Sequence, residues 1–146
     1  DTSLRERPTP AYLEQEFTVK IAGVPVKGRI DRIDALADGF EIIDYKTGRP
    51  KTEEEVLKDF DVRRQLALYQ LAAEDVLKIP VAKLTLWYVE DGSRVSFPPK
   101  PKDVQKIREE IEGVVKGLSE SDFSPKPSYL CRYCDFKDIC DFAERG

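Results

Sequence analysis

The segment from Gly28 to Pro50 constrains the fold of this chain more than any other. It reads GRIDRIDALADGFEIIDYKTGRP, two runs of apolar residues separated by an Asp-Gly pair at 38–39. An Asp-Gly pair between such runs is a strong signal for a β-hairpin. The second run, 40–46, is almost continuously apolar at its centre, which predicts a strand buried on both faces.

The rest of the chain predicts a mixed sheet with helices. Residues 1–13 read as an irregular lead-in, and the alternation that follows predicts a strand up to Ile21. The further expected elements are an acidic helix start at 53–60, a helix over 62–77, strands at 83–89 and 95–97, a helix over 103–118 and a polar tail over 119–146. This order is typical of an α/β or α+β protein. In the 62–77 helix, the inward side is expected to carry Leu66, Tyr69, Leu71 or Ala72, and Val76.

Length and composition describe one globular domain. The 146 residues are 40% hydrophobic and 36% charged, and they suffice for one hydrophobic core. No apolar run approaches the ~20 residues that span a bilayer, and the N-terminus has no signal-peptide pattern. We therefore expect a cytoplasmic protein with no membrane partner. The chain begins at Asp1 and contains no Met, so we expect it to be a piece of a larger protein.

Charge and residue types exclude several classes of function. The net charge of −4 argues against coating nucleic acid through bulk charge, although it leaves room for a local basic groove. The sequence has no His. That excludes the Ser-His-Asp and Cys-His hydrolases and the His-based zinc enzymes.

Two aspartates and a lysine form the first candidate site. Asp44 and Lys46 are two residues apart in a predicted strand, so their side chains point to one face. If the hairpin pairs through the turn at 37–39, Asp31 lies ~5 Å from Asp44. Two carboxylates so close repel unless a divalent cation such as Mg²⁺ or Mn²⁺ neutralises them. A lysine beside the cation can orient water or stabilise charge on a phosphate.

The alternative interpretation is that these groups are surface charges forming weak salt bridges. Asp44 and Lys46, however, end an apolar strand that contains Ile42 and Ile43, where solvated charges are not expected. A charge placed there requires a partner. The sequence therefore favours a phosphodiester-cleaving site that works without His.

These residues resemble the motifs of the PD-(D/E)XK nucleases of the RecB and AddB type. Gly28 and Asp31 match the family's G-x-x-D, residues 44–48 match D-Y-K-T-G, and Gln65 with Tyr69 matches Q-x-x-x-Y. The pattern is also similar to CRISPR-associated nucleases and to the nuclease tails of UvrD-like helicases. The resemblance covers residues 14–140.

The resemblance implies a restriction-endonuclease-like fold and a role for each matching residue. Asp31, Asp44 and the backbone carbonyl of Tyr45 would bind the metal, and Lys46 would be the catalytic lysine. Gln65 and Tyr69, one helical turn apart, would lie beside the active site. From the residues alone, Tyr69 is equally well explained as a core aromatic.

A further metal-binding acid is expected upstream. Glu14 and Glu16 both precede the apolar part of the first strand, and the family pattern favours Glu14. Asp34 and Asp38 are interpreted as surface and turn residues.

Several basic residues lie near these motifs. They are candidates for contacts with DNA phosphates, or else solvated surface residues: Arg29, Arg32, Arg49, Lys51, Arg63 and Arg64.

The tail holds the second candidate site, 131-CRYCDFKDIC-140. Its three cysteines, Cys131, Cys134 and Cys140, do not resemble a secreted disulfide framework. Their spacing is similar to part of the 4Fe–4S site in four-cysteine members of the family, and the fourth cysteine would lie before Asp1. Zinc is the competing occupant, and it too requires four ligands. The remaining alternative is three reduced cysteines in an unliganded tail.

Together these features predict a Mg²⁺- or Mn²⁺-dependent, exonuclease-like deoxyribonuclease in DNA repair or recombination. The expected substrate is single-stranded DNA, and the expected partner is a helicase domain or subunit. The isolated chain could be inactive. Two rivals remain: a nuclease fold that binds DNA or a partner without cutting, and a structural domain built around iron–sulfur or zinc.

Overall fold

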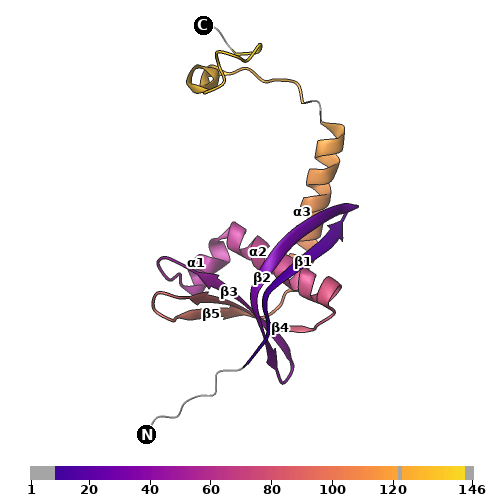
Figure 1. The fold of residues 1–146 in the computed structure, drawn as a ribbon, viewed down its shortest axis with the longest axis vertical. Helices are drawn as coiled ribbons and strands as arrows, with labels where there is room; N and C mark the ends of the chain where they lie inside the picture. The colour runs from indigo at the N-terminus through magenta and orange to yellow at the C-terminus, as the bar shows by residue number, and fades with distance from the viewer. Residues whose placement is uncertain (1–8, 122, 144–146) are drawn as a thin grey trace. The chain divides into compact units, whose positions relative to one another are not determined.

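The computed structural model describes residues 9–121 and 123–143. The chain divides into two compact units, residues 1–115 and 116–146. The first unit contains the sheet, the helices that pack on it and all the hairpin residues discussed above (Figure 1).

The first unit is built on one five-stranded mixed sheet. Its strands are β1 Pro10–Ile21, β2 Val24–Leu36, β3 Gly39–Lys46, β4 Val81–Tyr88 and β5 Arg94–Phe97, and they are hydrogen-bonded in this order. Neighbouring strands are antiparallel except β3 and β4, which are parallel. The predicted mixed sheet flanked by helices is confirmed.

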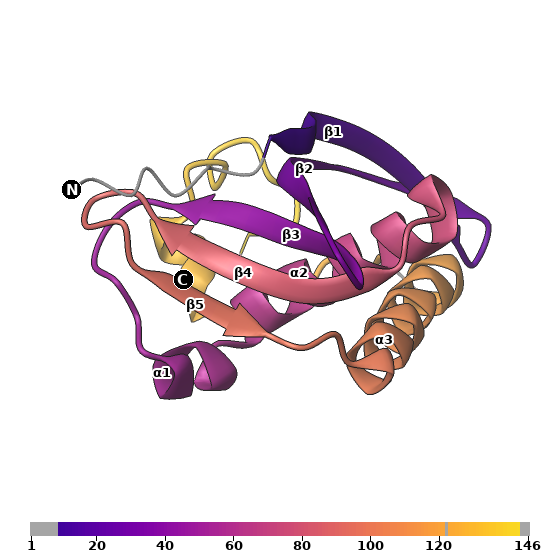
Figure 2. The same cartoon turned by 90° about the horizontal axis from the view of Figure 1, so that it is seen from below.

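Helices connect the two parallel strands. The crossover contains α1 Glu53–Lys58, α2 Phe60–Ala72 and the π-helix η1 Ala73–Leu77. Asp59 separates α1 from α2, because its carboxylate accepts hydrogen bonds from the backbone N–H groups of Asp61 and Val62 and so starts a new helix. Parallel strands need a crossover of this kind. Figure 2 shows α2 running behind β3 and β4.

The core lies between the helices and one face of the sheet. Ile42, Leu84 and Leu86 of the sheet are almost fully buried against Leu71 and Ala72 of α2 in one apolar cluster. Burial of this kind, at about 25 cal/mol per Å² of apolar area, is the main force that fixes α2 on the sheet.

The π-helix explains why Val76, predicted to face inward, is exposed. Val76 is 38% exposed, whereas Leu66, Tyr69, Leu71 and Ala72 are buried as expected. The wider turn of a π-helix changes the angle between successive side chains. The spacing that places Leu66 and Tyr69 inward therefore no longer applies at Val76, which lies within η1.

Helix α3, Pro101–Glu120, is fastened to α2 by ion pairs as well as by apolar contacts. Arg63 pairs with Asp103 at 3.1 Å, and Arg64 pairs with Glu110 at 2.8 Å. Ile107 adds a buried side chain to the core. Arg63 and Arg64, predicted as candidates for DNA contacts, thus already have partners within the protein.

Two element boundaries differ from the predictions. Strand β1 begins at Pro10, inside the expected irregular lead-in, because residues from Pro10 onward find partners on β2. Helix α3 begins at Pro101, two residues before the predicted start at 103. Proline is well suited to the first turn of a helix, where its missing N–H costs no hydrogen bond.

The other face of the sheet carries a buried polar layer. Asp34 is only 2% exposed, and both of its oxygens accept hydrogen bonds from Arg32, at 2.7 and 2.9 Å. The hydrogen bond to Asp34 raises the pKa of Arg32 above its usual value. Glu41 is also buried and accepts a hydrogen bond from the hydroxyl of Thr85. The interpretation of Asp34 as a surface residue is therefore wrong.

The second unit contains the end of α3 and the cysteine segment. Its short 3₁₀ helix η2, Tyr129–Tyr133, begins at Ser128, whose hydroxyl accepts a hydrogen bond from the N–H of Leu130. Many of its large apolar side chains are exposed, including Tyr133 at 81% and Ile139 at 79%. Within the described ranges, no helix combines the length and apolar character needed to cross a membrane.

The Arg32–Asp34 pair should matter to stability. We expect Arg32→Leu to lower the free energy of unfolding by about 3 kcal/mol, because it leaves the buried Asp34 carboxylate without its guanidinium. Urea denaturation at pH 7 measures the change. Arg49→Leu is the matched control, since Arg49 pairs with Glu55 at 2.7 Å but is 71% exposed. It should lower the free energy of unfolding far less, because water screens an exposed pair. Equal losses would contradict the assignment of the cost to burial.

Candidate active site

The hairpin brings the two predicted aspartates level with each other. Arg32 of β2 pairs with Ile43 of β3, so Asp31 lies one position further along and opposite Asp44. The backbone N–H of Tyr45 donates a hydrogen bond of 2.9 Å to Oδ2 of Asp31. This bond fixes the Asp31 carboxylate against the end of β3.

The hairpin bends where it passes these aspartates. Ile30 and Ile33 are both fully buried in the core although they are three residues apart. In a regular strand only residues an even number apart share a face, so the alternation of β2 is interrupted between them. On β1, Glu14 lies between the partners of Ile30 and Arg32, level with Asp31, and has a left-handed φ of 48°. A non-glycine residue in this region is uncommon and marks a local distortion. The bend places Asp31 on the same side as Ile33.

Lys46 connects the aspartates to helix α2. Its Nζ lies 2.7 Å from Oδ2 of Asp44 and donates a hydrogen bond of 2.6 Å to Oε1 of Gln65. The lysine side chain is 27% exposed, whereas the Asp44 side chain is 4% exposed. The lysine side chain is therefore partly open to solvent, whereas its partner Asp44 is enclosed by the protein.

Gln65 and Tyr69 form the helical part of the site. Nε2 of Gln65 donates to the hydroxyl oxygen of Tyr69 at 3.0 Å. An ammonium can only donate hydrogen bonds, so Lys46 requires the carbonyl oxygen of Gln65, and its amide group must then face Tyr69. Burial and then the charge of Asp44 raise the pKa of Tyr69 from its ordinary value of 10.0 to about 12.

Asp44 is the electrostatic centre of the site. Burial raises the pKa of Asp44 above its ordinary value, and the charge of Asp31 adds to the rise while Lys46 opposes it. Despite the short distance to Lys46, Oδ2 is a buried oxygen without a well-aligned hydrogen bond to any described residue. Buried carboxylate oxygens rarely lack such a partner.

The donor set fits a divalent cation of the Mg²⁺ or Mn²⁺ type. Such ions prefer carboxylate and carbonyl oxygens, and the under-satisfied Oδ2 of Asp44 beside the Asp31 carboxylate offers them. Within residues 9–121 and 123–143, however, no three acidic, cysteine or histidine side chains gather into a metal-holding group. The protein side of such a site would therefore be a carboxylate pair with help from backbone oxygens.

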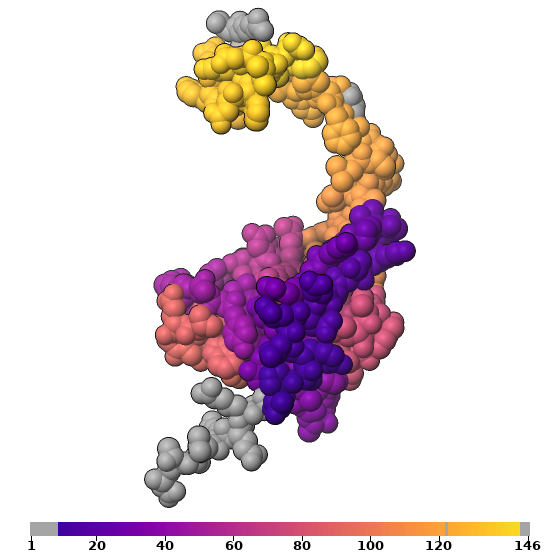
Figure 3. All heavy atoms as spheres, viewed as in Figure 1, coloured from indigo at the N-terminus to yellow at the C-terminus, as the bar shows by residue number. Residues whose placement is uncertain are grey.

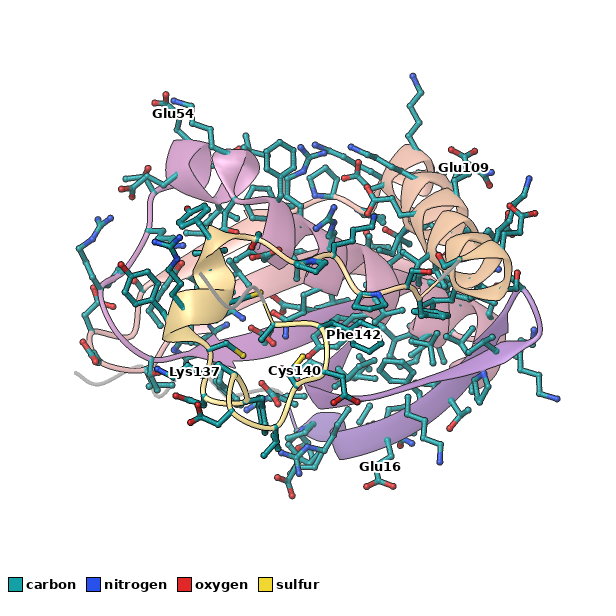
Figure 4. All side chains as sticks on the ribbon, turned by 90° about the horizontal axis from the view of Figure 1, so that it is seen from above. Glu16, Glu54, Glu109, Lys137, Cys140 and Phe142 are labelled. Carbon is teal, nitrogen blue, oxygen red and sulfur yellow. The ribbon has the colours of Figure 1, made fainter. Side chains whose placement is uncertain are left out.

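Neither candidate for the upstream acid joins this pair. Glu14 is level with Asp31 along the hairpin, but its carboxylate lies 3.4 Å from the guanidinium of Arg29 and both side chains are exposed. Glu16 is exposed and projects away from β1 (Figure 4). The metal roles predicted for Glu14 and for the carbonyl of Tyr45 stay predictions. The ring of Tyr45 points to the other face, 5.5 Å from that of Trp87.

The three cysteines lie in the described part of the tail. No disulfide joins Cys131, Cys134 or Cys140 among the described residues, and Cys134 is exposed. Sγ of Cys131 accepts a hydrogen bond from the N–H of Ser128. Figure 4 labels Cys140 in the segment that follows η2. Their role as ligands of a cluster stays a prediction.

A cleft leads to the lysine. It has a volume of about 540 Å³ and is lined by the β1–β2 hairpin, α2 and α3. Its wall combines apolar side chains, Phe17, Leu68 and Ile107, with the cationic groups of Arg29 and Lys46. Figure 3 shows the hairpin strands at the surface of the first unit. The sequence analysis does not single out these three apolar residues, because apolar spacing alone does not distinguish a core from a cleft wall.

Comparison with known proteins agrees with this geometry. The family model of the PD-(D/E)XK nuclease superfamily matches residues 1–141. The Gene 69 proteins of Mycobacterium phages D29 and L5 are similar to this chain, with 30% identity over 90% of it and 27% identity over 96% of it. The match covers 48% of each phage protein, so the chain spans about half the length of these curated relatives.

A solved structure shares the fold. A crystal structure from Eubacterium rectale, described as a candidate exonuclease, superposes with a TM-score of 0.57 at 12% identity. The superposition covers 92% of this chain and 54% of the other. The likeness confirms the predicted restriction-endonuclease-like α/β fold.

The raised pKa of Asp44 predicts how stability changes with pH. The folded protein binds this proton more tightly than the unfolded chain, so the Asp44 carboxylate lowers the free energy of unfolding as pH rises above the ordinary value of 3.8 and through its raised folded pKa. Asp44→Asn should therefore be more stable than the wild type at pH 7 in EDTA, by about 1 kcal/mol. The advantage should shrink toward pH 4. Urea denaturation across this range measures it, and an advantage independent of pH would contradict the prediction.

Proposed function

Because the chain belongs to the PD-(D/E)XK nuclease superfamily, we propose that it is a divalent-metal-dependent DNA nuclease that hydrolyses phosphodiester bonds. The observation that carries this proposal is the buried Asp44 carboxylate, whose Oδ2 lacks a well-aligned hydrogen bond although it lies beside Asp31 and Lys46. The Lys46 ammonium offsets part of the negative charge of the two carboxylates. The acceptor capacity that remains on them is what a divalent cation requires.

Each residue of the site has a task in this reaction. Asp31 and Asp44 would hold Mg²⁺ or Mn²⁺, with the carbonyl of Tyr45 as a further ligand. When bound, the cation supplies Lewis-acid activation of the phosphoryl group and of water. Lys46, partly exposed in the lining of the cleft, would contact the phosphate and stabilise the negative charge that develops on it.

Gln65 and Tyr69 orient the lysine. Oε1 of Gln65 accepts a hydrogen bond from Lys46, and the Tyr69 hydroxyl fixes the direction of the Gln65 amide. The Tyr69 hydroxyl is uncharged throughout the neutral pH range, and its raised pKa of about 12 extends that range further upward. The pair therefore keeps the ammonium in place without adding charge to the site.

The cleft favours single-stranded DNA as the substrate. Unpaired bases can pack against partly exposed apolar side chains such as Val62 and Leu68, and Arg29 can contact phosphates. A paired duplex hides its bases and gains nothing from an apolar wall. We propose exonuclease-like cleavage with little sequence preference, since cationic side chains read the backbone and not the bases.

The setting of the chain is also a proposal. It would be the nuclease domain of a larger helicase–nuclease or DNA-repair protein, fed with single strands by a helicase domain or subunit. The phage relatives, about twice as long as the matched region, agree with a larger whole. In that protein, Cys131, Cys134 and Cys140 would join a fourth cysteine around a 4Fe–4S cluster.

Substitution of the site residues tests the activity. Asp31→Ala, Asp44→Ala and Lys46→Ala should each reduce Mg²⁺- or Mn²⁺-dependent cleavage of a labelled single strand by at least about 10³-fold, because each removes a group that acts on the transition state. Circular dichroism should show that the fold persists. The matched control is Asp38→Ala, an exposed aspartate of the same hairpin.

The outcomes separate the rival functions. Cleavage that survives Asp44→Ala would refute the assignment. A wild-type chain that binds the strand and Mn²⁺ but yields no products would instead be a binding module. If chelation at the cysteine segment leaves cleavage intact, that segment is at most structural.

A further inference from the structure

The ring of Phe17 on β1 packs directly on the backbone of Gly28 on β2, on the side of the hairpin that faces helix α2. The two residues are cross-strand partners on β1 and β2. A Cβ atom at Gly28 would lie 2.5 and 2.9 Å from ring carbons of Phe17, closer than any side chain tolerates. The ring therefore lies directly on the backbone of Gly28, and only glycine permits this position.

The ring of Phe17 contacts the helical part of the candidate active site. Its centroid is 6.2 Å from that of Tyr69, and the two planes are at 83°, an edge-to-face arrangement. Both rings are buried, Phe17 with 4% and Tyr69 with 8% exposure. In this geometry each ring limits how far the other can turn.

From Tyr69, hydrogen bonds lead to the lysine. The Tyr69 hydroxyl accepts from Gln65 at 3.0 Å, and Gln65 accepts from Lys46 at 2.6 Å. A shift of the Tyr69 ring moves its hydroxyl, then the Gln65 amide and finally the ammonium. No side-chain hydrogen bond from Lys46 to a described residue other than Gln65 has good geometry, so a loosened Gln65 leaves only the poorly aligned contact with Asp44.

We propose that Phe17, seated on Gly28, is a positioning residue that holds Tyr69 and, through Gln65, sets the place of the Lys46 ammonium. The inference rests on the proposed function only where Lys46 acts on phosphate. It gives the glycine of the G-x-x-D pattern a physical reason: the glycine makes room for a ring, while the aspartate three residues on would help to hold the cation.

The test compares two identical substitutions in one core. Phe17→Leu removes the ring edge beside Tyr69. Phe97→Leu removes an equally buried ring, 8% exposed, on β5 opposite Leu84. Three quantities are measured for each variant: the free energy of unfolding, kcat and KM on a labelled single strand with Mn²⁺, and the acetylation rate of Lys46 in EDTA, read by mass spectrometry.

We expect similar losses of stability but different effects on the site. Phe17→Leu should lower kcat by about tenfold, the scale of one lost aromatic contact at the chemical step, with KM changed less than about twofold. It should also speed acetylation of Lys46 severalfold, since the ammonium is less firmly held. Phe97→Leu should change neither quantity.

A second substitution tests the contact between the Phe17 ring and Gly28. Gly28→Ala should reproduce the loss of kcat in the wild type, because the added methyl group displaces the ring. In the Phe17→Leu background the same change should have less than about a twofold further effect, since the clash is gone. If the two substitutions had independent effects, Gly28 would not act by making room for the Phe17 ring.

The failure of this inference differs from the failure of the proposed function. If Phe17→Leu and Phe97→Leu alter kcat and Lys46 acetylation equally, Phe17 is a core residue and nothing more. If the wild type does not cleave under any metal condition, the proposed function fails, and the acetylation rates of the two variants still decide whether Phe17 positions Lys46.

Discussion

The contact between Lys46 and the buried Asp44 is the interaction on which the site depends. A carboxylate at the end of an apolar strand is costly, and one lysine offsets only part of that cost. The neighbouring side chains modify this charge balance. Asp31 adds negative charge, Gln65 accepts a hydrogen bond from the Lys46 ammonium, and Tyr69 accepts a hydrogen bond from Gln65 on the helix side. The result is a polar cluster with spare acceptor capacity, which is what a cation and a phosphate require.

Much of this could be predicted from the sequence because the signals are local. The Asp-Gly turn and the alternation along the strands determine the hairpin, and the hairpin places Asp31 level with Asp44. The Gln65–Tyr69 spacing puts both on one helical face. What the sequence could not provide depends on tertiary geometry. The π-helix that turns Val76 outward and the bend at Glu14 both involve backbone conformations with no residue signature of their own.

The two faces of the sheet show why residue type alone does not identify a site. Asp34 and Asp44 are both buried aspartates beside a positively charged side chain, Arg32 and Lys46 respectively. Arg32 satisfies Asp34 completely through two hydrogen bonds, and that pair is structural. Lys46 leaves an oxygen of Asp44 without a good partner. The difference is the geometry of the donor, a planar fork in one case and a single ammonium in the other.

The alternation along β3 also limits how a protein of this kind can change in length during evolution. Ile42, Asp44 and Lys46 share one face, while Glu41, Ile43 and Tyr45 share the other. Inserting or deleting one residue within 40–46 would exchange the faces, placing isoleucine where the acid belongs and a carboxylate in the apolar core. The turn at 37–39 and the segment between β3 and α1 are under no such restriction. Length variation should therefore collect at the two ends of this strand and leave its interior unchanged.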